Sequence, residues 1–171
     1  MKTLILFRHG KSDWEADNGE DHDRPVSERG VSAARTQGRL LKLAAQEPDS
    51  VVTSSAVRAR KTVELAMEAG KWGSKLRITR ALYEATPFIV LEEVRAEPDT
   101  TRKLLLAGHE PTWSELTSLL IGGGVVRFPT ACMVRIDFEV ESWKSVDYGR
   151  GALIWIVPPK LFTQGKFDFT D

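Results

Sequence analysis

The sequence predicts an α/β protein with three layers, in which helices cover both faces of a mostly parallel central sheet. Short apolar runs typical of buried strands alternate along the chain with longer segments of helical periodicity. The 171 residues, of which 42% are hydrophobic, suit one globular domain. No linker, internal repeat or low-complexity tract divides them. We therefore place no boundary and treat residues 1–171 as a single domain.

The chain begins with a compact apolar run at residues 3–7, which predicts a buried strand. Residues 10–26 are polar and rich in turn-forming residues, so we expect a long loop there. Long ordered loops inside compact domains often carry function. Ser27 is a suitable N-cap for a helix over about 28–45, and Pro48 ends that helix.

The middle of the chain repeats the alternation of strand and helix. A short β-branched run predicts a strand at 50–54, and a helix over 56–69 follows, with Gly70 as its C-terminal cap. A third strand is expected at 76–79. A Thr-Pro pair, Thr as N-cap and Pro at the first helical position, predicts a helix over 86–95.

The last part of the chain completes the sheet. Residues 103–107 predict another buried strand, and a helix from Pro111 ends at the triple glycine 122–124. Two late strands are expected at 131–138, where apolar and polar residues alternate, and at 152–157. Four strand-helix repeats followed by two strands favour a sheet whose first four strands are parallel.

Composition excludes several functional classes. The 24 basic residues balance the 24 acidic ones, so the chain lacks the basic excess of nucleic-acid-binding proteins. No apolar run approaches the ~18 residues of a membrane span, and the N-terminal run is too short for a signal peptide. Cys132 is the single cysteine, so no intrachain disulfide can form. We expect a cytoplasmic protein that binds neither nucleic acid nor membrane.

Polar residues follow the predicted parallel strands at the edge where such sheets bind ligands. Arg8, His9 and Gly10 follow the first strand, Ser54, Ser55, Arg58 and Arg60 the second, Tyr83 and Glu84 the third, and Gly108, His109 and Glu110 the fourth. If the sheet is as predicted, these residues converge on one edge.

This set of side chains suits phosphoryl transfer. A neutral imidazole is a nucleophile, arginine forks bind phosphate oxygens, and phosphoryl transfer depends mainly on positioning and charge stabilisation. No cluster has metal-ligand spacing, so we expect no metal and no other cofactor. Each residue alone is more simply explained as an ordinary loop or surface residue. The hypothesis depends on the whole set in its order.

Four stretches, in this order, resemble the motifs of the histidine phosphatase superfamily, which has the phosphoglycerate mutase-like fold. They are Leu6-Phe7-Arg8-His9-Gly10-Lys11-Ser12-Asp13-Trp14, Asp23-Arg24-Pro25-Val26-Ser27-Glu28-Arg29-Gly30, Ser54-Ser55-Ala56-Val57-Arg58-Ala59-Arg60-Lys61-Thr62 and Leu106-Ala107-Gly108-His109-Glu110-Pro111-Thr112. The short length, Phe128-Pro129-Thr130-Ala131 and Pro158-Pro159-Lys160 resemble the small SixA-type phosphohistidine phosphatase branch.

The resemblance implies a role for each matching residue. His9 would be the nucleophile, Arg8 and Arg58 would clamp the phosphoryl oxygens, His109 would donate to the phosphoryl group, Arg24 would line the phosphate site, and Glu84 would stand where relatives place a proton donor. Whether Glu84 is that donor stays open. Arg60 lies one helical step off the face of Arg58 and is expected to matter far less. Ala56 replaces the usual proline of its motif.

We therefore expect a metal-independent phosphatase that works through a phosphohistidine intermediate on His9. Its substrate would be phosphohistidine in a protein, with a histidine-containing phosphotransfer protein as a candidate partner. Imidazole leaves more easily than an alcohol, and a short chain without a lid insertion leaves the site open to a protein. The alternatives are a small-molecule phosphomonoesterase or phosphoglycerate mutase-like enzyme, and a non-catalytic module that binds a phosphorylated ligand. The oligomeric state cannot be inferred from the sequence.

Other residues near the motifs have simpler interpretations. Trp14 and Trp113 are expected to wall the pocket. Cys132 is expected to pack in the core as part of a strand. His22 could join a metal site, but the simpler expectation is a solvated loop residue.

Overall fold

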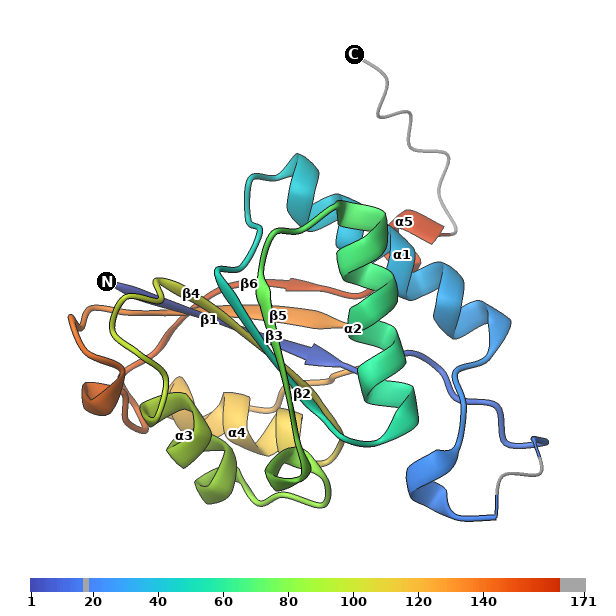
Figure 1. Ribbon diagram of the computed structural model, residues 1–171. Coiled ribbons are helices and arrows are strands. Elements are labelled where there is room, and N and C mark those ends of the chain that lie inside the picture. Colours follow the sequence, from blue (N-terminus) through green and yellow to red (C-terminus); the bar gives the residue numbers. More distant parts are fainter. Residues whose placement is uncertain (17–18, 164–171) are drawn as a thin grey trace.

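A six-stranded sheet runs through the computed structural model, which describes residues 1–16 and 19–163 (Figure 1). The strands are β1 (Lys2–Arg8), β2 (Ser50–Ser54), β3 (Lys75–Thr79), β4 (Lys103–Gly108), β5 (Met133–Phe138) and β6 (Ala152–Val157). Their order across the sheet is β3-β2-β4-β1-β5-β6. The first four strands are parallel, and β5 and β6 are antiparallel additions beside β1. The predicted mostly parallel sheet is confirmed.

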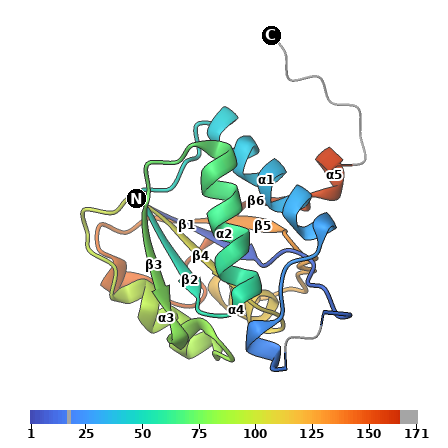
Figure 2. The same cartoon turned by 45° about the vertical axis from the view of Figure 1, so that its right-hand side comes forward.

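Helices cover both faces of this sheet (Figures 1 and 2). The helices are α1 (Glu28–Leu43), α2 (Val57–Gly70), α3 (Pro87–Arg95), α4 (Thr112–Leu120) and the short α5 (Lys160–Thr163), with 3-10 turns η1 (Asp21–Asp23), η2 (Arg80–Leu82) and η3 (Trp143–Ser145). Helices α1 and α2 pack on one face, and α3 and α4 on the other. The short α5 lies beside α1. None of the described helices has the length and apolar character that crossing a membrane requires.

Strand β1 shows why three layers form. Successive side chains of a strand point to opposite faces of the sheet. Leu4 and Leu6 belong to the core under α3 and α4, whereas Ile5 and Phe7 belong to the core under α1 and α2. All four are fully buried, and burying each such side chain contributes about 1.5–3 kcal/mol. A continuous apolar run is therefore the sequence pattern of a strand covered on both faces.

Helix starts follow their predicted caps. The Ser27 hydroxyl accepts a hydrogen bond from the amide of Gly30 at the start of α1, and the Thr86 hydroxyl accepts one from Ile89 at the start of α3. These side chains satisfy amides that have no partner within the first helical turn. Helix α4 begins at Thr112, one residue after the expected start at Pro111.

The predicted end of α2 is wrong in detail. Gly70 is still helical, and the left-handed residue that follows the helix is Lys71, with φ of 51°. A Cβ on Gly70 would lie 2.4 Å from the carbonyl oxygen of Gly38 in α1 and 2.3 Å from Nε1 of Trp72. Glycine stands here because α1 and α2 approach closely, and not because the helix needs a glycine to end.

The start of β5 was also placed too early. The prediction began at residue 131, but Ala131 has φ of 57°, which strand backbone does not adopt. Cys132 precedes the strand and is fully buried, so its expected core position is confirmed although its expected secondary structure is not.

Candidate active site

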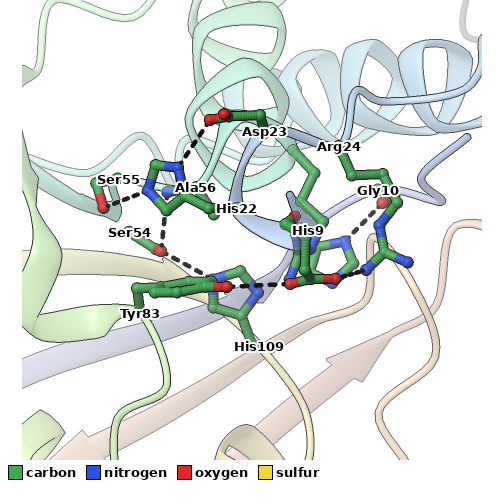
Figure 3. Close-up of polar contacts among 12 residues, drawn as sticks. His9, Gly10, His22, Asp23, Arg24, Ser54, Ser55, Ala56, Tyr83 and His109 are labelled. Carbon is green, nitrogen blue, oxygen red and sulfur yellow. Dashed lines mark hydrogen bonds and ion pairs between the residues drawn. The ribbon is translucent and has the colours of Figure 1, made fainter. Parts of the chain in front are cut away.

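The pairing of β1 with β4 brings the two predicted histidines together. Arg8 is in register with Gly108, so His9 and His109 each follow the end of one of two adjacent parallel strands. The amide of His9 donates to the carbonyl of Gly108 over 3.1 Å, and the two imidazole centroids are 5.2 Å apart. Figure 3 shows the side chains of His9 and His109 in the site. The sheet backbone therefore sets the distance between the two rings.

The loop after β1 is tied to both α1 and α2. The amide of Gly10 donates to Oγ1 of Thr62 over 2.8 Å, and that hydroxyl donates to the carbonyl oxygen of Arg58 over 2.7 Å. A Cβ on Gly10 would lie 2.9 Å from the carbonyl oxygen of Gly30. Glycine at positions 10 and 30 lets the loop lie against the start of α1. This packing links the segment that carries His9 to the helix turn that carries Arg58.

His9 is prepared to act as a nucleophile through Nε2. Its Nδ1 lies 2.7 Å from the carbonyl oxygen of Gly10. A carbonyl can only accept, so Nδ1 carries the hydrogen and Nε2 keeps its lone pair. The pKa of His9 is lowered to about 4, chiefly by burial; the hydrogen bond to Gly10 opposes this shift, and nearby Arg58, Arg8 and Arg24 add to it. The imidazole is neutral at neutral pH, the state that nucleophilic attack requires.

His109 is held by the residue that ends β2. Its Nε2 lies 2.8 Å from Oγ of Ser54, and the amide of Ala56 donates a hydrogen bond to the same Oγ over 3.3 Å (Figure 3). The pKa of His109 is lowered to about 3, chiefly by burial, with smaller contributions from His9 and Arg58. Nδ1 of His109 is buried and has no hydrogen-bond partner among the described residues. It is free to interact with a ligand.

The three predicted arginines surround His9. Arg8 ends β1, Arg24 follows η1 and Arg58 lies in the first turn of α2. All three line one cleft of about 480 Å³ with His9 and His109. Nη1 of Arg8 donates to the carbonyl oxygen of Phe128 over 2.7 Å. The Nε atoms of all three arginines are buried without a partner among the described residues. Guanidinium groups that retain unused donors can bind the oxygens of a phosphoryl group.

Arg60 contrasts with Arg58 in the same helix turn. Arg60 is exposed and lies 3.6 Å from the carboxylate of Glu64. Arg58 is 6% exposed and lines the cleft. The predicted helix face is confirmed.

Asp21 is a site residue that the sequence reasoning missed. Its carboxylate accepts hydrogen bonds from Nη2 of Arg24 over 2.6 Å and from Nη2 of Arg58 over 2.9 Å. The same carboxylate accepts one from the hydroxyl of Tyr83 over 3.2 Å. Its backbone oxygen accepts from Nη1 of Arg58 over 2.6 Å. The sequence held one signal for this residue: Asp21 lies three residues before Arg24, a spacing at which an acidic and a basic side chain can pair in a helical turn.

His22 was expected to be a solvated loop residue, and this expectation is wrong. Its Nε2 lies 2.9 Å from Oγ of Ser55, and its Nδ1 lies 3.0 Å from the carboxylate of Asp23 (Figure 3). The ring also meets the ring of Tyr83 edge-on at 4.9 Å. These contacts hold η1 against the segments that follow β2 and η2.

Glu84 lies near the site without touching it through a polar contact. It is exposed and has φ of 54°. Within the described residues, Glu84 makes no hydrogen bond and no ion pair. It lines a second cleft of about 420 Å³, which also includes Asp21, Arg58 and His109. The structure thus places Glu84 beside the site, and its role as proton donor stays a prediction.

The two tryptophans flank the site in different ways. Trp14 is 75% exposed and lines the cleft of His9, with the guanidinium of Arg24 stacked 3.5 Å from its ring centroid. Trp113 is fully buried and packs against Gly108, where a Cβ would lie 2.4 Å from the indole. Trp14 walls the cleft of His9 as expected. Trp113 lines the second cleft, which includes His109, and also supports the end of β4 from within. In the ranges 1–16 and 19–163, no group of three or more His, Cys, Asp or Glu side chains could hold a metal ion.

Comparison with known proteins finds relatives by sequence. Residues 4–103 match the family model of the histidine phosphatase superfamily, branch 1. The uncharacterised protein Rv1276c of Mycobacterium tuberculosis is 33% identical over 165 residues, which cover 90% of this chain and 100% of that protein. A 2,3-bisphosphoglycerate-dependent phosphoglycerate mutase of Sphingopyxis alaskensis is 42% identical, but over 71 residues that cover only 31% of the mutase.

Solved structures share the fold over nearly the whole chain. A candidate phosphohistidine phosphatase SixA from Nakamurella multipartitia matches with a TM-score of 0.82 and 24% identity, covering 92% of this chain and 96% of that one. The protein histidine phosphatase SixA complexed with tungstate matches with a TM-score of 0.81 and 21% identity, covering 94% and 99%. A mycobacterial glucosyl-3-phosphoglycerate phosphatase matches with a TM-score of 0.66 and 18% identity, covering 90% and 97%. The architecture is therefore the phosphoglycerate mutase-like fold.

Proposed function

This chain belongs to the histidine phosphatase superfamily, branch 1, and we propose that it removes the phosphoryl group from phosphohistidine in a protein through a covalent intermediate on His9. The observation that carries the proposal is the state of His9. Its Nδ1 is committed to the carbonyl of Gly10, its Nε2 is free and its ring is neutral, next to three guanidinium groups.

The reaction proceeds in two steps. Nε2 of His9 attacks the phosphorus, and the bond from phosphorus to the leaving group breaks. Water then attacks the phosphohistidine on His9 and releases phosphate. Arg8, Arg24 and Arg58 hold the phosphoryl oxygens in both steps, and His109 contacts them through its free Nδ1. Fixed charges at these positions stabilise the charge that develops in the transition state.

Two features favour a phosphorylated protein as the substrate. Chains with TM-scores of 0.82 and 0.81 to this one are described as phosphohistidine phosphatases. The cleft of His9 also continues past Lys11, Arg29 and Lys160, which line both it and an adjacent cleft of about 300 Å³. A positively charged groove that extends beyond the nucleophile can contact the protein surface around a phosphorylated side chain as well as the phosphoryl group itself.

A small phosphate ester is the second candidate substrate. An alcohol leaving group needs a proton, and the carboxylates of Asp21 and Glu84 lie at the cleft that borders His109. The glucosyl-3-phosphoglycerate phosphatase shares this fold. Assays that compare a phosphorylated histidine-containing phosphotransfer protein with a panel of phosphorylated metabolites separate the two candidates. A higher kcat/KM for a small phosphate ester than for the phosphorylated protein would overturn the proposal of a protein substrate.

The nucleophile is tested with His9→Ala. We expect the variant to lose essentially all turnover of p-nitrophenyl phosphate and of the phosphorylated protein, because no other residue can form the intermediate. Wild type treated with radiolabelled substrate and quenched in alkali should carry label, and the variant should not. Activity in wild type should persist after treatment with a chelator. Label on the variant would place the nucleophile elsewhere, and activity restored only by a divalent ion would contradict the mechanism.

A further inference from the structure

We propose that Asp21 is the proton carrier of this site: it gives a proton to the leaving oxygen of a phosphate ester in the first step and takes one from water in the second. This inference rests on the proposed function, because it assigns a role within the same two-step reaction. It gives to Asp21 the role that the family resemblance places at Glu84.

The contacts of Asp21 place its carboxylate at the phosphoryl group. One carboxylate oxygen is 2.6 Å from Arg24 and the other is 2.9 Å from Arg58, and both arginines line the cleft of His9. A phosphoryl group bound to the remaining donors of these arginines would have the carboxylate as a direct neighbour. Glu84 has no such link to an arginine within the described chain.

The position of Asp21 also fits the direction in which a leaving group departs. In an in-line displacement, the attacking and leaving atoms lie on opposite sides of the phosphorus. His9 is 8% exposed, whereas the side chain of Asp21 is 52% exposed. The nucleophile is therefore the buried partner, and the leaving group departs toward the solvent side, where Asp21 lies.

The charges around Asp21 allow it to change protonation during the reaction. In the free protein, hydrogen bonds and charge from Arg58, with Arg24 and Tyr83, lower its pKa against a desolvation effect that raises it. A bound phosphoryl dianion competes for the same arginines and adds negative charge beside the carboxylate. Both effects raise the pKa of Asp21 when substrate binds. The hydrogen bond from Tyr83 keeps the carboxylate in place.

The two steps balance with Asp21 as carrier. In the first, Nε2 of His9 bonds to phosphorus, the bond to the ester oxygen breaks, and the proton of the Asp21 carboxylic acid moves to that oxygen to give an alcohol. In the second, water bonds to phosphorus, its proton moves to the Asp21 carboxylate, and the electron pair of the broken bond returns to Nε2 of His9. Phosphate leaves and Asp21 is protonated again.

The test compares two esters in the variant Asp21→Asn. p-Nitrophenyl phosphate has a good leaving group that needs little protonation, and phenyl phosphate has a poorer one. We expect kcat for phenyl phosphate to fall by about 10²–10³, in the range of a lost general acid, and kcat for p-nitrophenyl phosphate to fall less than about tenfold. The basic limb of the kcat profile for phenyl phosphate, which reports the acid in the bound complex, should disappear in the variant.

A matched control is Asp23→Asn, because Asp23 lies in the same turn and contacts His22 without contacting an arginine. In this variant, the ratio of kcat for phenyl phosphate to kcat for p-nitrophenyl phosphate should equal that of wild type. If Asp21→Asn lowered kcat for both substrates to the same extent, Asp21 would only orient the arginines, and the proposal would be overturned. A selective loss in Glu84→Gln without one in Asp21→Asn would assign the proton to Glu84. Failure of the proposed mechanism on His9 can be told apart from failure of the Asp21 proposal, because it would appear as phosphatase activity that survives in His9→Ala.

Discussion

The site has two parts that differ in how the protein holds them. The site floor comprises Arg8, His9, Arg58 and His109. The site rim comprises Asp21, His22, Tyr83 and Glu84. Floor residues lie at strand ends and in the first turn of α2, and their backbone is fixed by the register of β1 with β4 and by the hydrogen bonds of Gly10 and Thr62. Rim residues lie in or just after the 3-10 turns η1 and η2.

Side chains alone connect much of the rim to the floor. Asp21 contacts Arg58, and His22 contacts Ser55 beside the end of β2. None of the three residues of η1 is buried, although Arg24, which follows the turn, is buried. Most of the groups proposed to bind the phosphoryl group therefore lie in the part of the molecule that the sheet and α2 fix, whereas Arg24 reaches the cleft from the segment after η1. On our proposals, substrate choice and proton transfer would fall to the rim, whose turns have less buried anchorage.

The largest effect should follow from removing a floor charge. Arg58→Ala should lower kcat by about 10²–10³, the loss seen when one preorganised donor is removed from a transition-state site. Arg60→Ala is the matched control in the same helix turn and should change kcat by less than about threefold, because its pair with Glu64 is exposed. Steady-state kinetics with p-nitrophenyl phosphate measure both. Similar losses in the two variants would contradict the assigned helix face.

An intermediate effect is expected from pH. Burial lowers the pKa of His9 to about 4 and that of His109 to about 3, so both rings are neutral in the free protein above pH about 5. The profile of kcat/KM reports groups of the free enzyme. With p-nitrophenyl phosphate, whose leaving group needs little protonation, and after correction for ionisation of the substrate, kcat/KM should stay level as the pH falls from 7 to 5 and should decline only nearer pH 4. A decline centred near pH 6.5 would mean that the floor is more hydrated than its geometry indicates.

The smallest effect is expected at the rim. Tyr83→Phe removes a hydroxyl that donates to Asp21 over 3.2 Å at a solvent-exposed position. The acceptor is a carboxylate, but the contact is long and solvent screens it, so we expect a contribution of only about 1 kcal/mol and a fall in kcat of about two- to fivefold. The melting temperature should stay within a few degrees of wild type. A large drop in melting temperature would show that the rim is part of the folded framework and would remove its contrast with the floor.

Sequence patterns predicted the floor better than the rim for a physical reason. The apolar run of β1 and that of β4 identify strands covered on both faces, and parallel strands end at the same edge of a sheet. The proximity of His9 and His109 follows from those two statements. The interpretation needed only local patterns and one general rule of sheet topology.

The positions of Asp21 and His22 in the rim depend mainly on contacts between residues far apart in the chain. Asp21 and His22 take their positions from Arg58 and Ser55, which are more than thirty residues away in the chain. The role of Gly70 likewise depends on Gly38 in another helix, which is why a helix cap was the natural but incorrect prediction. The late start of β5 reflects the positive φ of Ala131, whose amide donates to the carbonyl of His9.

The division of β1 between two cores bears on how the molecule opens. Leu4 and Leu6 are buried under one pair of helices, and Ile5 and Phe7 under the other. Loosening one layer leaves the strand held by the opposite one, so its amides should exchange with solvent only when the whole domain unfolds. Turn η1 has no buried residue and η2 contributes only Leu82 to one of the two cores, so both lack this double anchorage and should open more readily. The segment that carries the nucleophile thus belongs to the most slowly opening unit of the fold, while the groups around its solvent side open and close many times for each such event.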